Sequence, residues 1–165
     1  MQTLFRGKHF VTLRDWSQDE VETLLKVSTQ LKMDFAMGKI NDTLKNQTIF
    51  LMFFEQSTRT RNSMEAGITQ LGGHNIAEGQ VGNWGPLSPE YVLSQKPDLI
   101  FLAGSEWLNK PQSVQMGFGA TAEVARERMA AYLKRPGWSN LPAVKNHGVH
   151  GIYHGGARTL SDYVY

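Results

Sequence analysis

Continuous apolar runs alternate with segments of helical periodicity along this chain. Residues 48–54 and 98–103 are such runs, which is typical of strands covered on both faces of a sheet. Shorter segments at 74–77 and 149–153 predict two further strands. The chain therefore contains four candidate strands separated by candidate helices.

The helices are marked by their start signals. Ser17 is followed three residues later by Glu20, which predicts a capping box, and apolar positions at helical spacing continue to Gly38. Similar signals predict helices that start directly after residue 57, at Ser88, at Thr121 and at Thr159.

Strands and helices alternate from residue 48 onward. This order predicts a parallel sheet with helices on both faces, joined by right-handed crossovers. We therefore expect residues 1–165 to form a single three-layer α/β domain. Its mostly parallel sheet of four to five strands would have a flavodoxin-like or Rossmann-like order.

Composition narrows the function classes. A length of 165 residues, 41% of them hydrophobic and 19% charged, suits one globular domain. The net charge of +2 is too small to indicate nucleic acid as a partner. No apolar run approaches a membrane span, and the N-terminus lacks the apolar core of a signal peptide. We expect no membrane partner and a cytoplasmic location.

The first strand is followed by Ser57-Thr58-Arg59-Thr60-Arg61, directly before a helical pattern. A helix start offers unpaired N–H groups and the positive end of a dipole, and arginine adds a planar fork that suits phosphate. We therefore predict that Ser57, Thr58, Arg59 and Thr60 bind phosphate or sulfate. The alternative is a plain helix cap with Arg59 in solvent.

Residues from about 8 to 76 resemble the carbamoyl-phosphate domain of the aspartate/ornithine carbamoyltransferase family, most closely the acetylornithine type. The resemblance is carried by residues 53–67 and by Gln70-Leu71-Gly72-Gly73. It implies that residues 57–60 contact the phosphate of carbamoyl phosphate. Arg61 and Glu65 are four residues apart, which predicts a structural ion pair.

Residues from about 82 to 165 resemble a different family, the C-terminal lobe of periplasmic binding proteins that serve siderophore, haem and cobalamin ABC importers. The segments that carry this second resemblance are residues 84–93, 96–100, 135–138, 141–146 and 149–154.

Each half departs from its family. The first lacks the His-Pro-x-Gln segment and the amine-binding domain, and the second lacks its partner lobe. We therefore interpret residues 1–77 and 78–165 as halves of an engineered chimera that is not an enzyme and retains anion binding. Two alternatives remain: a carbamoyltransferase that binds carbamoyl phosphate, and a lobe that binds a metal chelate or porphyrin. Surface left by missing parent domains could form a homodimer.

Other polar residues are weaker candidates. His147, His150 and His154 lack the converging ligands that zinc requires, so we expect solvated or capped histidines. A second anion nest at Gly155, Gly156 and Arg158 is an alternative to a simple glycine turn. We assign no catalytic residue, no metal and no cofactor.

Overall fold

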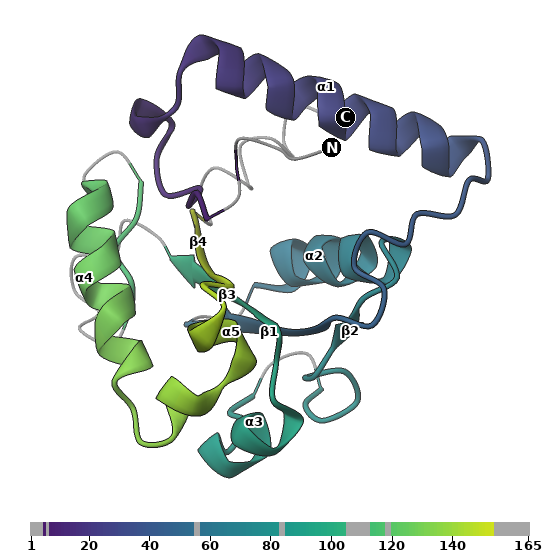
Figure 1. Cartoon of the computed structure of the whole chain (residues 1–165). Helices are drawn as coiled ribbons and strands as arrows, with labels where there is room; N and C mark the ends of the chain where they lie inside the picture. Colours follow the sequence, from purple (N-terminus) through teal and green to yellow (C-terminus); the bar gives the residue numbers. More distant parts are fainter. Residues whose placement is uncertain are drawn as a thin grey trace.

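A computed structural model describes residue 5 and residues 7–54, 57–82, 85–104, 113–117 and 120–153. Within these ranges four strands form one parallel sheet in the order β2-β1-β3-β4 (Figure 1). The strands are β1 (Thr48–Phe53), β2 (His74–Asn75), β3 (Leu99–Gly104) and β4 (Val149–Tyr153). All four lie within two residues of the predicted bounds.

The predicted helices are also present where the structure describes the chain. They are α1 (Gln18–Ala36), α2 (Thr58–Gln70), α3 (Pro89–Gln95) and α4 (Ala122–Leu133). Three short elements were not predicted: η1 (Leu13–Asp15), η2 (Trp138–Asn140) and α5 (Pro142–Lys145). The helix predicted from Thr159 lies outside the described residues.

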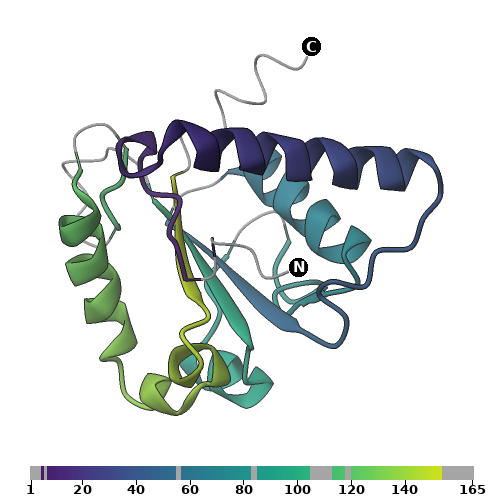
Figure 2. The same ribbon diagram turned by 45° about the horizontal axis from the view of Figure 1, so that its top comes forward.

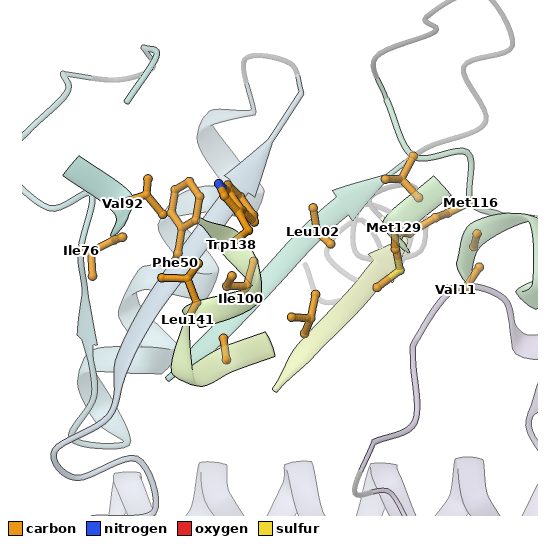
Figure 3. Close-up of a cluster of buried hydrophobic side chains, with 14 residues drawn as sticks. Val11, Phe50, Ile76, Val92, Ile100, Leu102, Met116, Met129, Trp138 and Leu141 are labelled. Atoms are coloured by element: carbon orange, nitrogen blue, oxygen red, sulfur yellow. The ribbon is translucent and has the colours of Figure 1, made fainter. Parts of the chain in front are cut away.

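Helices cover both faces of the sheet, which confirms the three-layer α/β class (Figure 2). Ile68 of α2 is buried with Ile49 and Leu51 of β1 on one face. Val92 of α3 and Met129 of α4 belong to the larger cluster on the opposite face. Figure 3 shows this larger cluster, which also includes side chains from α5 and η2.

The two central strands come from different halves of the sequence. β1 and β3 pair in parallel over five residues, from Ile49 opposite Leu99 to Phe53 opposite Ala103. The start of the pair is fixed by Asp98, whose carboxylate accepts hydrogen bonds from the Thr48 N–H at 2.9 Å and hydroxyl at 2.8 Å. One continuous sheet therefore spans the predicted junction near residue 77.

The capping box at the start of α1 is confirmed. The Ser17 hydroxyl accepts from the Glu20 N–H, and the Glu20 carboxylate accepts from the Ser17 N–H. However, the apolar spacing of this helix does not lead to burial, because no α1 residue is buried and Leu25 and Phe35 are 54% and 61% exposed. The apolar face of this helix is half-buried, at positions such as Val21, Leu24 and Leu31, and the capping box adds local stability.

The N-terminal segment extends the sheet beyond β4. Phe10 pairs in parallel with Ile152, donating its N–H to the Gly151 C=O and accepting from the Tyr153 N–H. The Gly151 N–H in turn donates to Nδ1 of His9 at 3.2 Å. This contact joins residues more than 140 positions apart and closes the outer edge of β4.

A substitution at Gly104 tests how tightly the end of β3 is packed. A Cβ at this position would lie 2.4 Å from the Val114 carbonyl oxygen. We expect Gly104→Ala to lower the free energy of unfolding by about 1–3 kcal/mol through overpacking, as measured by urea denaturation. Gly67→Ala is the control, since its Cβ would meet nothing within 4 Å in α2, and it should stabilise by about 0.4–1 kcal/mol. Equal stability of the two variants would contradict this packing.

The His9 contact predicts a pH dependence of stability. Burial chiefly, and then His150 and Arg126, lower the pKa of His9, and burial lowers the pKa of His150 although a backbone hydrogen bond with Lys8 opposes it. As the pH falls below the ordinary histidine pKa of about 6.5, His9 and His150 therefore bind protons in the unfolded chain before they do so in the folded chain. Stability should be complete above that pH and fall as pH drops through the lowered pKa values.

Urea denaturation between pH 7.5 and pH 5 measures this slope. His9→Asn retains an acceptor for the Gly151 N–H but does not titrate, so part of the slope should disappear. A slope that is identical in the wild type and His9→Asn would show that His9 does not contribute to it.

Candidate functional site

The helix α2 starts immediately beyond the carboxyl end of β1. β1 ends at Phe53, and Ser57 is the N-cap residue of α2. The chain leaves β1 toward β2 on one side and leaves β3 toward β4 on the other. Open α/β sheets bind ligands outside the carboxyl ends of strands at such a reversal of strand order. The predicted anion-binding residues therefore lie at the position where this architecture favours a ligand.

The N-terminus of α2 differs from those of α1, α3 and α4. Each of the other three is capped by a side chain, from Ser17, Ser88 or Thr121, and carries an acidic residue in its first turn. In α2 the Ser57 side chain makes no capping hydrogen bond and the first turn has no acidic residue. Its backbone donors and positive dipole end thus meet neither a capping side chain nor a carboxylate of that turn.

The four predicted residues share this first turn but differ in exposure. Thr58 and Arg59 are exposed, Ser57 is half-buried, and Thr60 is only 7% exposed. An anion from solvent could therefore reach the side chains of Thr58 and Arg59 most directly. The proposed second nest at Gly155, Gly156 and Arg158 lies outside the described residues.

Arg61 belongs to a structural network. Its Nε lies 3.4 Å from the Glu65 carboxylate, which confirms the predicted ion pair, and its Nη1 donates to the Gly82 C=O at 2.8 Å. The other carboxylate oxygen of Glu65 accepts from Nδ2 of the buried Asn75 at 2.7 Å. No sequence pattern indicates Asn75 or Gly82, because both contacts depend on how β2 and its loop pack against α2.

His147 and His150 differ in exposure. His147 is exposed in a turn with φ 57°, whereas His150 is half-buried in β4 with its ring centroid 6.0 Å from that of His9. His154 lies outside the described residues. In the part of the chain that is described, no three His, Cys, Asp or Glu residues are grouped to hold a metal ion, and no helix is long and apolar enough to cross a membrane.

The first half of the chain matches a known family. Residues 8–84 match the family model described as aspartate/ornithine carbamoyltransferase, carbamoyl-P binding domain. The ornithine carbamoyltransferase of Ruthia magnifica subsp. Calyptogena magnifica is 37% identical over 100 residues, which are 58% of this chain and 33% of that protein. That of Hydrogenovibrio crunogenus is 40% identical over 100 residues, with the same shares. The chain thus spans about a third of the length of these curated relatives.

Solved structures of two kinds resemble the fold. The TroA-like periplasmic binding protein FepB from Veillonella parvula has a TM-score of 0.63 and 30% identity, covering 78% of this chain and 39% of that protein. Ligand-free aspartate transcarbamoylase from Trypanosoma cruzi has a TM-score of 0.54 and 15% identity, covering 89% of this chain and 40% of that protein. At 15% identity the second likeness concerns the fold alone.

These matches correct one prediction. The chain was expected not to be an enzyme, but the matched relatives are named ornithine carbamoyltransferases, which points to an enzyme family. The expectation failed because it gave more weight to the missing His-Pro-x-Gln segment than to the extent of the match. The comparisons support both predicted resemblances. The family model matches the carbamoyltransferase domain, and a solved structure matches a periplasmic binding protein.

The Glu65 network can be tested by truncation. Glu65→Ala leaves the Asn75 amide buried without its acceptor, which should lower the free energy of unfolding by about 1–3 kcal/mol in urea denaturation. Glu65→Gln keeps an acceptor oxygen and should lose less. Asn62→Ala, at an exposed position of the same helix, is the matched control and should change little. If the three variants were equally stable, the network would have no structural role.

Proposed function

We propose that this chain binds carbamoyl phosphate through its phosphate group at the start of α2, as the carbamoyl-phosphate-binding part of a carbamoyltransferase. The observation that carries the proposal is the N-terminus of α2, which lacks both a side-chain cap and an acidic first turn and lies inside the matched residues 8–84. A phosphate needs hydrogen-bond donors and positive charge, and this helix start offers both.

The proposed site would hold the phosphate in two ways. The first backbone N–H groups of α2 would donate to its oxygens, while Arg59 and the Thr58 hydroxyl would supply side-chain donors from exposed positions. During carbamoyl transfer the phosphate leaves as the amine attacks the carbamoyl carbon, so the same donors would stabilise the charge on the leaving group. The transfer also needs an amine held in the right orientation. We assign amine binding to the part of the relatives, about two thirds of their length, that this chain does not match.

A second proposal concerns the origin of the chain. The match of residues 8–84 to one family and the 30% identity to a periplasmic binding protein support a chimera of two families. Parallel pairing of β1 with β3 explains how the halves of such a chimera would share a sheet. The binding-protein likeness also favours a second candidate function, in which the latter half acts as a ligand-binding lobe.

Titration with phosphate and with carbamoyl phosphate, followed by NMR of the backbone amides, tests the proposed site. We expect saturable shifts of residues 57–61 with both ligands. Arg59→Ala should weaken binding at least tenfold, since a charge-assisted hydrogen bond contributes about 1.5–3 kcal/mol.

Arg14→Ala is the matched control, because it removes one exposed positive charge from η1, far from α2 in the sequence. It should leave both affinities unchanged. Equal weakening by Arg14→Ala and Arg59→Ala would indicate general charge attraction, and an absence of shifts at residues 57–61 would overturn the proposal.

A further inference from the structure

A cavity of about 210 Å³ lies beside the carboxyl half of β1. β2 pairs only with Thr48 and Ile49, and the last bond of this ladder joins the Ile76 N–H to the Ile49 C=O. Beyond that bond, no described strand covers this edge of β1, and Leu51 and Phe53 line the cavity. The short length of β2 therefore creates the space.

Elements from both faces of the sheet line the cavity, which opens to solvent. Arg61 and Glu65 of α2 form part of one wall, and Val92 of α3 and Trp138 of η2 form part of another. None of the residues Ser57 to Thr60 lines it. The cavity is therefore separate from the proposed phosphate site.

Trp138 presents an unsatisfied donor at this wall. Its side chain is 2% exposed, and its buried indole Nε1 has no hydrogen-bond partner among the described residues. Figure 3 shows the nitrogen on the edge of the ring that faces Phe50 and Val92, and both of these residues line the cavity. Buried N–H groups nearly always have an acceptor, so this one indicates a missing partner.

An exposed arginine brings a positive charge to the rim of the cavity. Arg61 is paired with Glu65, so these two charges balance. Arg135 lines the same cavity, and its guanidinium lies 4.6 Å from the ring centroid of Tyr132 and 5.5 Å from that of Trp138. Within the described ranges, Arg135 has no carboxylate within ion-pair distance, which leaves its planar fork available to an anion.

The size of the cavity limits the ligand. An apolar cavity of about 150 Å³ holds benzene, while sites for larger ligands measure about 300–1,000 Å³. A volume of about 210 Å³ therefore fits one ring with one small substituent. Its apolar lining, with Phe50, Met52 and Leu87, suits an aromatic ring.

We propose that this cavity is a second ligand site, for a small single-ring aromatic carboxylate. The ring would lie against Met52 and Leu87 beside Trp138, and the carboxylate would pair with Arg135 and accept from the Trp138 indole N–H. This ligand supplies an acceptor for the Trp138 indole, a negative charge for Arg135 and an apolar ring for the apolar lining.

Benzoate is the probe, added to the isotopically labelled chain at pH 7 and followed by NMR. We expect a saturable shift of the Trp138 indole resonance, identified by its loss in Trp138→Phe. Arg135→Gln should weaken benzoate binding at least tenfold. Arg126→Gln, an exposed arginine on α4, is the matched control and should have no effect.

Two further ligands separate the contribution of the aromatic ring from that of the carboxylate charge. Benzyl alcohol keeps the ring without the charge and should bind more weakly, whereas acetate keeps the charge without the ring and should not shift Trp138. Inorganic phosphate should shift residues 57–61 and leave Trp138 unchanged, so this site and the phosphate site can fail independently. Benzoate shifts that bypass Trp138, or that Arg135→Gln leaves unaltered, would overturn the proposal.

Discussion

The parallel pairing of β1 with β3 is the constraint on which the rest of the structure depends. Each strand comes from a different half of the chain, and five residue pairs hold them in register. The Asp98 carboxylate fixes the first pair by accepting two hydrogen bonds from Thr48, while the Asp98 N–H donates back to the Thr48 C=O at 2.8 Å. A shift of one residue would move every β1 side chain to the opposite face. Ile49 and Leu51 would then leave the cluster that they form with Ile68, and Phe50 would leave the larger cluster.

Both candidate sites follow from this arrangement. Because β1 lies next to β3 and the chain turns away from them in opposite directions, the start of α2 lies at the reversal of strand order, where open α/β sheets bind ligands. Because β2 is only two residues long, the other edge of β1 is left for loop and helix side chains to close. The position of the proposed anion site thus depends on strand order, and the cavity depends on the length of β2.

The sequence predicted the elements better than their contacts. The strands could be predicted because a continuous apolar run such as residues 48–54 is rare outside a buried sheet, and the helices because Ser17, Ser88 and Thr121 are strong start signals. The pairing of Phe10 with Ile152 could not, since one isolated bridge leaves no period in the sequence. The exposure of α1 was missed for a related reason. Helical spacing shows that an apolar face exists, but burial depends on what packs against it.

The two arginines of the Ser-Thr-Arg-Thr-Arg motif show how position decides between structure and binding. Arg61 lies one turn above Glu65 on the same side of α2, so its charge is used to hold β2 and the following loop in place. Arg59 lies two residues earlier and is exposed, and no acidic residue precedes it in the first turn. The sequence resemblance does not distinguish the two arginines, whereas the structure places them in different surroundings. In the proposed phosphate site, Arg61 would orient the helix through Glu65, and Arg59 would bring its exposed guanidinium to the phosphate.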